Sequence, residues 1–98
     1  MIVRIVQMTF REDVVSEFTT LFAERKDTIR NFKGCSHLEL WQDNTRANVF
    51  FTYSKWDSQA DLDNYRFSEF FKDTWSKTKA LFADKPQASS VTPRYVLM

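Results

Sequence analysis

Few side chains in this sequence are suited to acid–base or nucleophilic chemistry. His37 is the only histidine, and its ordinary pKa of about 6.5 makes it the one side chain suited to act as a general base near neutral pH. It could deprotonate a phenol, or it could be an exposed residue at the start of a strand. Cys35, the only cysteine, follows the end of a predicted helix, where nothing activates a thiolate, so we expect it to be buried and unreactive.

Three further polar side chains could contact a substrate. Tyr65 lies on the apolar face of a predicted helix, where its hydroxyl could orient a phenolic ligand or lie at the edge of the core. Gln7 and Glu39 lie on predicted strands, and each could point into a cavity or lie exposed at a sheet end. Tyr65, Gln7 and His37 are therefore the candidate catalytic residues, and Glu39 is a candidate substrate contact.

Aromatic residues make up 16% of the 98 residues and include ten Phe and three Trp. So many large rings in a small domain indicate a dense core, an interface or an apolar pocket. Trp75, Phe70 and Tyr53 are the candidates for contact with a planar ring. Aromatic residues at helical spacing are more often core, and Tyr53 could instead join Trp41 and Phe50 in a contact between two sheets.

Charge and composition disfavour several classes of protein. The 14 basic and 13 acidic residues give a net charge of +1 with no basic block, so we expect no nucleic-acid partner. One glycine cannot form a phosphate-binding loop, and one histidine with one cysteine lacks further ligands for a metal. No apolar run approaches the roughly 20 residues of a membrane span, and the first residues do not read as a secretory signal. We expect a cytoplasmic protein.

The residues that could do chemistry are positioned by one domain, residues 1–98, with the order β-α-β-β-α-β. Gly34 is placed to end the first helix in a left-handed conformation, Asp13 to cap its start, and Ser58 with Asp61 to cap the second helix. We expect the second helix to break near residues 66–69, because its length is too great for so small a domain. The predicted strands span residues 2–10, 35–42, 47–55 and 90–97, and the helices span residues 14–32 and 57–82.

This order predicts a ferredoxin-like α+β fold, an antiparallel sheet with helices on one face. The strands are apolar at both odd and even positions, as residues 2–10 show, so the second face of the sheet must also be covered. Two such sheets packed face to face would cover it and leave a space between sheet and helix in each protomer. We therefore expect a homodimer formed through the open sheet face.

The segments FKGCSHLELWQD, YSKW and DSQADLDNYRFSEFF, in this order and spacing, resemble the antibiotic biosynthesis monooxygenase family. The resemblance covers nearly the whole chain and implies the dimeric α+β barrel of that family. Trp56 matches the tryptophan that follows the third strand in the family, and Ser58 matches the helix cap after it. Tyr65 occupies a position where many members have His or Trp.

The resemblance implies a cofactor-independent monooxygenase that acts on a small aromatic phenol or quinol with molecular oxygen and neither metal nor flavin. Gln7 lies near where some members place a pocket Asn. Trp75 falls where haem-degrading members have their ligand His, so we do not expect haem degradation. Ser54 also departs from the Glu that is common at its position. The alternatives are a non-catalytic or stress-related protein that binds a small ligand in the same cavity, and a dimeric module whose aromatic residues are all core.

Overall fold

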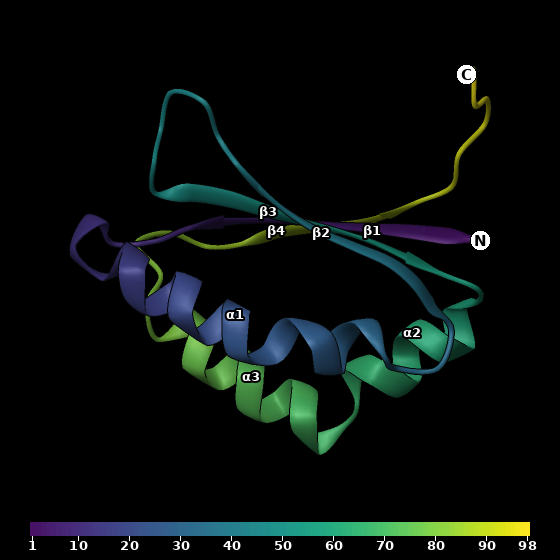
Figure 1. Cartoon of the computed structure of the whole chain (residues 1–98), viewed down its shortest axis with the longest axis horizontal. Coiled ribbons are helices and arrows are strands. Elements are labelled where there is room, and N and C mark those ends of the chain that lie inside the picture. The colour runs from purple at the N-terminus through teal and green to yellow at the C-terminus, as the bar shows by residue number, and fades with distance from the viewer.

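The computed structural model describes all residues, 1–98, as a four-stranded antiparallel sheet with every helix on one side of it (Figure 1). The strands lie in the order β2-β3-β1-β4, which is the ferredoxin-like arrangement. The predicted α+β fold class is confirmed. The elements are β1 (Ile2–Thr9), the short 3-10 helix η1 (Glu12–Val14), α1 (Val15–Arg30), β2 (Cys35–Gln42), β3 (Val49–Trp56), α2 (Gln59–Arg66), α3 (Glu69–Lys79) and β4 (Gln87–Val91).

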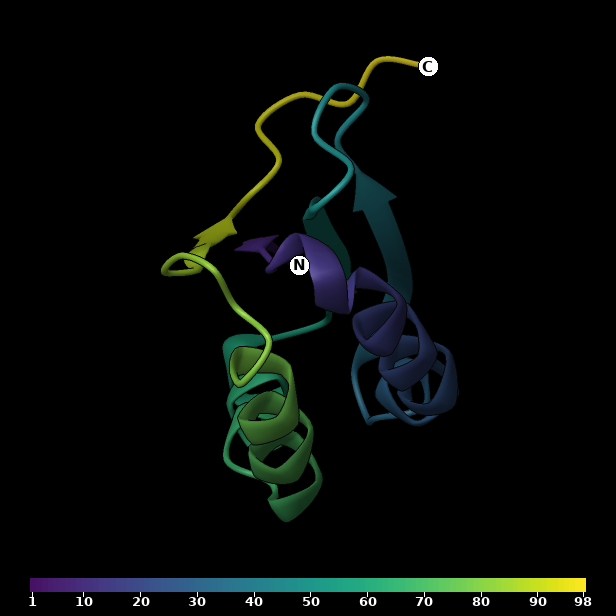
Figure 2. The ribbon, with the colours of Figure 1, turned by 90° about the vertical axis from the view of Figure 1, so that its left-hand side faces the viewer.

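The helices form a single layer beneath the sheet. In the view of Figure 2, α1 lies on the β2 side and α3 on the β4 side. The other side of the sheet carries no helix: only the β2–β3 turn and the C-terminal segment rise there (Figure 1). Each strand therefore turns one set of side chains toward the helices and the alternate set toward an uncovered face.

The first helix begins later than the sequence predicts. The chain first makes the 3-10 turn η1, and α1 starts at Val15 with no side-chain cap, so the predicted capping role of Asp13 is wrong. The end of the helix is as predicted: Gly34 has a φ of 84°, the left-handed conformation that glycine adopts without steric cost. The Gly34 carbonyl accepts a hydrogen bond from the Asp57 backbone N–H at 2.8 Å, which ties the start of β2 to the end of β3.

The predicted break in the second helical region is confirmed. The chain forms two helices, and Ser58 and Ser68 cap them by accepting hydrogen bonds from the backbone N–H groups of Asp61 and Phe71, each at 3.1 Å. The Ser68 hydroxyl also donates to the Tyr65 carbonyl at 2.6 Å. A serine at each helix start thus sets the bend between α2 and α3.

The last strand is shorter and earlier than predicted. It spans Gln87–Val91 and pairs with β1, from Gln7 opposite Gln87 to Val3 opposite Val91. The predicted strand over residues 90–97 is wrong beyond Val91, because the apolar residues after Pro93 have no partner strand in this chain, and Tyr95 is 85% exposed. Polar residues form the strand because it is an edge strand with all residues exposed.

Two core clusters lie between sheet and helices. One joins Phe10, which is fully buried, to Phe18 in a stacked pair with ring centroids 4.0 Å apart. The other surrounds Trp56, which is 1% exposed, with Cys35 and Leu62. These clusters hold α1 and α2 against the sheet, and some of their members, Met8 and Trp56 among them, also line the space between sheet and helices. Phe50 belongs to the first cluster, so its predicted contact between two sheets is wrong.

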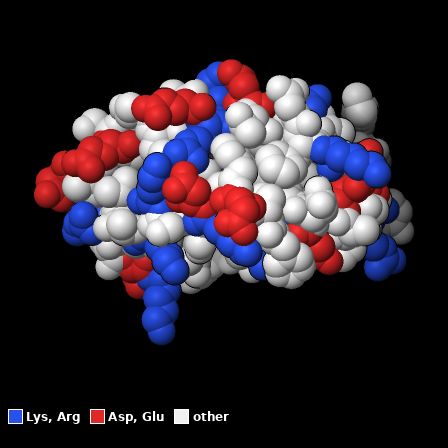
Figure 3. All heavy atoms as spheres, turned by 90° about the horizontal axis from the view of Figure 1, so that it is seen from below, with Lys and Arg blue, Asp and Glu red and all other residues white.

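On the helix side of the molecule, basic and acidic side chains are interspersed with uncharged surface (Figure 3). This face therefore does not present a surface potential of one sign. No helix in the chain has both the length and the apolar character needed to span a bilayer.

Candidate functional site

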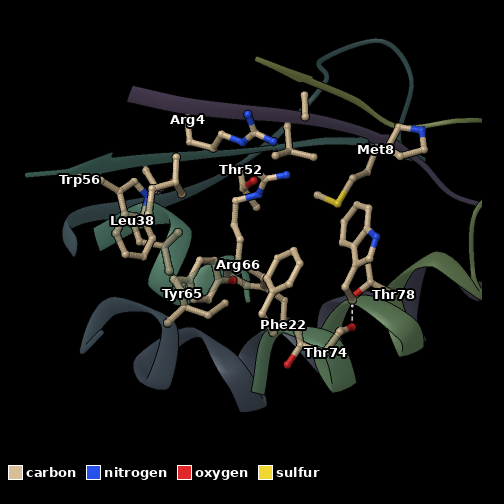
Figure 4. Close-up of a pocket in the computed structure, with 18 of the residues that line it drawn as sticks. Arg4, Met8, Phe22, Leu38, Thr52, Trp56, Tyr65, Arg66, Thr74 and Thr78 are labelled. Atoms are coloured by element: carbon tan, nitrogen blue, oxygen red, sulfur yellow. Dashed lines mark hydrogen bonds between the residues drawn. The ribbon is translucent and has the colours of Figure 1, made fainter. Parts of the chain in front are cut away.

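A cavity of about 300 Å³ lies between the sheet and the helices (Figure 4). Its 19 lining residues include 12 hydrophobic ones. The sheet forms the upper wall, where Arg4 and Met8 come from β1 and Thr52 from β3, and the helices form the lower wall, where Phe22 and Thr74 lie. A mostly apolar cavity with a few polar groups is the typical form of a small-molecule site.

Aromatic rings in contact with one another form much of the cavity wall. Trp56 and Tyr65 stack with centroids 5.0 Å apart, Tyr65 meets Phe71 edge to face at 5.0 Å, and Phe71 stacks on Trp75 at 5.9 Å. These residues come from β3, α2 and α3. The bend between α2 and α3 therefore brings Tyr65 and Trp75 to the same cavity, as the sequence predicts for these two residues.

The Tyr65 hydroxyl makes no hydrogen bond within the chain. Every fully buried side-chain nitrogen or oxygen atom does have a hydrogen-bond partner, so this hydroxyl is not fully buried. The hydroxyl is therefore accessible and free to bond with a ligand. Burial, with a smaller contribution from nearby Cys35, raises the pKa of Tyr65 far above its ordinary value. At neutral pH the side chain is a neutral phenol, which can donate a hydrogen bond to an anion but cannot act as a base.

Ser54 has a structural role in the wall. The Trp56 indole N–H donates to the Ser54 hydroxyl at 3.0 Å, and both residues are buried. This bond satisfies the indole nitrogen and fixes the ring that stacks on Tyr65. A serine at this position thus orients the aromatic wall and supplies no acid or base.

An ion pair on the helix side holds α1 against α3. Arg25 donates to the Asp73 carboxylate at 2.8 Å and to the Thr74 hydroxyl at 2.9 Å. Hydrogen bonds from Arg25 and Lys77 lower the pKa of Asp73. Since Thr74 lines the cavity, the Arg25 contacts fix that part of its lower wall.

Two arginines were missed by the sequence analysis. Arg4 on β1 and Arg66, the last residue of α2, both line the cavity. The signals were present: Arg4 shares the parity of Val6 and Met8, and Arg66 follows Leu62 by one helical turn. Charged residues on apolar faces indicate a polar part of a site more often than a defect in the core.

Four predicted site residues lie outside this cavity. Gln7, His37, Glu39 and Tyr53 point to the uncovered face of the sheet, because they alternate with the strand residues that face the helices. The prediction that Gln7 lines a pocket with Tyr65 and Trp75 is therefore wrong. For the same reason, His37 and Glu39 cannot act on a ligand bound in this cavity from within the same chain.

On the uncovered face these side chains form a connected cluster. The Glu39 carboxylate shares a hydrogen bond with the His37 ring and accepts one from the Trp41 indole at 2.7 Å, and these bonds lower the pKa of Glu39. Tyr53 stacks on Trp41 with centroids 4.9 Å apart, and the Lys55 ammonium lies 5.8 Å from the Tyr53 ring centroid. We call these five residues the open-face cluster.

Phe70 also lies away from the cavity. Its ring packs against Phe32 at a centroid distance of 5.7 Å, and the Arg25 guanidinium lies over it, also at 5.7 Å. Phe70 therefore belongs to the contact between α1 and α3, so its predicted contact with a ligand in this cavity is wrong. Helical spacing alone could not distinguish it from Phe71, the next residue along, which does line the cavity.

The single cysteine is buried, and burial raises the pKa of the Cys35 thiol. Its Sγ lies 3.6 Å from the His37 carbonyl oxygen, and no ring nitrogen is near enough to activate it. The structure contains no group of three or more His, Cys, Asp or Glu side chains placed to hold a metal ion. Within the cavity the titratable side chains are Arg4, Tyr65 and Arg66 alone.

The fold and the site together thus define a class of protein: a ferredoxin-like α+β domain with an aromatic cavity between sheet and helices. Residues 1–76 match the family described as antibiotic biosynthesis monooxygenase, and the chain belongs to that family. No curated protein sequence matches it.

Solved structures share the fold at low sequence identity. A crystal structure of an antibiotic biosynthesis monooxygenase is 18% identical, with a TM-score of 0.89 over 95% of this chain and 98% of that one. A conserved protein from Methanosarcina mazei is 16% identical, with a TM-score of 0.86 over 93% and 91% of the two chains. A variant of SnoaB, a cofactor-independent oxygenase from Streptomyces nogalater, is 16% identical, with a TM-score of 0.87 over 98% and 95%.

Proposed function

We propose that this protein is a cofactor-independent monooxygenase that oxygenates a small aromatic phenol or quinol. The observation that carries the proposal is the cavity walled by Trp56, Tyr65, Phe71 and Trp75, in a chain of the antibiotic biosynthesis monooxygenase family. Its volume of about 300 Å³ is at the lower end of the range for ligand sites, about 300–1,000 Å³, and suits a small ring system.

Oxygenation of a phenol or quinol can be carried out in a site that provides only amino-acid side chains. A deprotonated, electron-rich phenol reacts with oxygen directly: one oxygen atom enters the ring, the other leaves as water, and the ring, which becomes a quinone, supplies all the electrons. The protein needs to exclude water, hold the ring flat and stabilise its anion. The aromatic wall can hold the ring, and the neutral Tyr65 hydroxyl can donate a hydrogen bond to the anion.

Oxygen uptake with a panel of hydroquinones and naphthols tests this proposal. We expect consumption of oxygen above the buffer rate for at least one member, with the quinone as product and no added metal or flavin. Chelator-treated protein should retain the full rate. Rates equal to buffer for the whole panel would remove the enzymatic proposal.

A second candidate is a protein of the same fold that binds a small aromatic ligand without turnover. One observation favours it: the cavity contains no side chain with the ordinary pKa of a general base. For the enzyme, this means that the substrate must lose its proton without a basic side chain of the same chain. A ligand that binds tightly and consumes no oxygen would support the second candidate.

Replacing Tyr65 by phenylalanine is expected to lower kcat/KM for the oxygenated phenol by about tenfold, the usual effect of removing a hydrogen bond to a charged group. Because Tyr65 remains protonated in the neutral range, the pH profile should keep its shape and only shift downward. Steady-state oxygen uptake measures both. Thr52→Val, which removes another hydroxyl that lines the cavity, is the matched control. An unchanged kcat/KM together with unchanged ligand binding would remove Tyr65 from the mechanism.

We also propose that two copies of the chain pack through the open-face cluster. Trp41 is 40% exposed on the uncovered face, and Tyr53 stacks against it, so a second sheet would bury an aromatic surface there. Tyr53→Asp should raise the dimer dissociation constant by about tenfold or more, because the interface would have to desolvate a carboxylate.

Gel filtration with light scattering measures this change. The control is Thr20→Asp, which places the same charge at an exposed position of α1 on the opposite side of the molecule. It should leave the mass unchanged. A monomeric wild-type protein at micromolar concentration would contradict the proposed dimer.

A further inference from the structure

Arg4 and Arg66 are the only charged side chains that line the cavity, and no carboxylate of the chain pairs with either of them. All six salt bridges of the structure are made by other residues. Arg4 donates a single hydrogen bond, to the Ser90 hydroxyl at 2.9 Å, and the Arg66 guanidinium makes none within the chain. Most of their donor capacity is therefore unused.

The two guanidinium groups also face one another. Figure 4 shows the Arg66 side chain rising from α2 toward the Arg4 guanidinium, which hangs beneath β1. Burial and the charge of Arg66 together lower the pKa of Arg4. Two like charges brought together in a partly buried place are unfavourable unless an anion lies between them. An anion bound there would offset the repulsion and use the free N–H donors.

The rest of the cavity specifies what such an anion is attached to. Beyond the two guanidinium groups the wall is largely hydrophobic, with the stacked rings of Trp56 and Tyr65 and of Phe71 and Trp75. A free inorganic anion would leave that surface without a partner. A flat ring with a negatively charged oxygen would fill both parts, with the ring against the aromatic wall and the oxygen at the arginines.

We propose that Arg4 and Arg66 form a subsite for an anionic oxygen, so that the ligand of this cavity is an aromatic anion, either a ring carboxylate or a phenolate. A guanidinium presents parallel N–H donors that match such oxygens, which a lysine in either position would not. The catalytic role of the subsite rests on the proposed function: in the enzyme, the subsite would orient the ring before oxygen reacts. Binding of the anion itself needs no turnover.

Calorimetric titration with a matched pair of ligands tests the subsite. 1-Naphthoate and 1-naphthamide have nearly the same shape, but only the first is charged, and we expect the naphthoate to bind about tenfold tighter or more. A parallel titration of 4-nitrophenol below and above its own pKa shows whether a phenolate is accepted as well as a carboxylate. Added salt should weaken the binding of the anions and not of the amide.

Variants of the two arginines show whether the preference for the anion arises at these residues. Arg4→Gln and Arg66→Gln should each weaken naphthoate binding by about tenfold while leaving naphthamide within about twofold. The control is Arg46→Gln, an exposed arginine of the β2–β3 turn that lies near Asp43, and it should change neither affinity. Thermal unfolding of each variant identifies any loss of fold, and the ratio of the two affinities within one folded variant remains the deciding quantity.

The outcomes separate this inference from the proposed function. Preferential binding of the anion that depends on both arginines, without oxygen uptake for any substrate, would support the subsite and contradict the enzyme. Oxygen uptake with neutral quinols, together with equal affinities for naphthoate and naphthamide, would overturn the subsite and leave the enzyme standing. Equal weakening of both ligands by Arg4→Gln and Arg66→Gln would also overturn it.

Discussion

Replacing Trp56 by alanine is expected to lower the free energy of unfolding by about 3–5 kcal/mol. Trp56 is 1% exposed and belongs to the cluster with Cys35 and Leu62, so its removal leaves a void that the surrounding strands and helices cannot fill. The Ser54 hydroxyl also loses the hydrogen bond that it accepts from the indole N–H at 3.0 Å. For a domain whose total stability is of order 5–15 kcal/mol, this loss is a large fraction.

Urea unfolding followed by circular dichroism measures the effect of Trp56→Ala. The matched control is Trp56→Phe, which keeps an aromatic ring for the stack on Tyr65 but removes the indole N–H. It should cost clearly less than the alanine variant, with about 1 kcal/mol of the loss from the hydrogen bond. If the alanine variant unfolded at nearly the wild-type urea midpoint, Trp56 would not hold the end of β3 against α2.

Replacing Gly34 by alanine is expected to destabilise the protein by about 2–3 kcal/mol. Part of the cost arises because Gly34 has a φ of 84°, a conformation that an L-residue adopts only with strain. The rest arises because a Cβ at this position would overlap with both the Cβ and the carboxylate of Asp61. Asp61 would have to leave the Ser58 hydroxyl, to which it is hydrogen-bonded at the start of α2.

A double-mutant cycle separates the two causes. Asp61→Gly alone removes the hydrogen bond with Ser58, and in the Gly34→Ala background it should cost less, because it also removes the Cβ and the carboxylate that the alanine would meet. The backbone strain caused by Gly34→Ala is the same whichever residue occupies position 61. Strictly additive effects in urea unfolding would show that the alanine Cβ does not meet Asp61.

Local signals in the sequence were sufficient for much of the fold. Ser58 precedes a helical segment and caps it as predicted, and Gly34 has the positive φ expected of the only glycine. The last strand was misplaced, because it was predicted over residues 90–97 and only Ser90 and Val91 of that range belong to β4. Pairing with β1, which is not local, selected the polar segment instead.

The site was harder to predict, because both parities of the strands are largely apolar. On β1, Val6 and Met8 face the helices while Gln7 faces the uncovered side, and the sequence offers no local signal that fixes this choice. Helix periodicity placed Tyr65 and Trp75 on the apolar face of their helices, but it placed Phe70 there as well and could not show which of these rings lines the cavity. Arg4 was missed because a charged residue is expected to be exposed, and only the fold shows that it lies opposite Arg66.

The most direct test of the central claim, that the cavity between sheet and helices is the functional site, is an NMR measurement of where an aromatic ligand binds. The protein would be titrated with 1-naphthol under nitrogen, which prevents turnover, and magnetisation transfer from the ligand ring to protein methyl groups would be recorded. We predict transfer to the methyl groups of Met8 and Thr52, which line the cavity. Transfer to Ile5 on the uncovered face instead, or no saturable binding, would contradict the account.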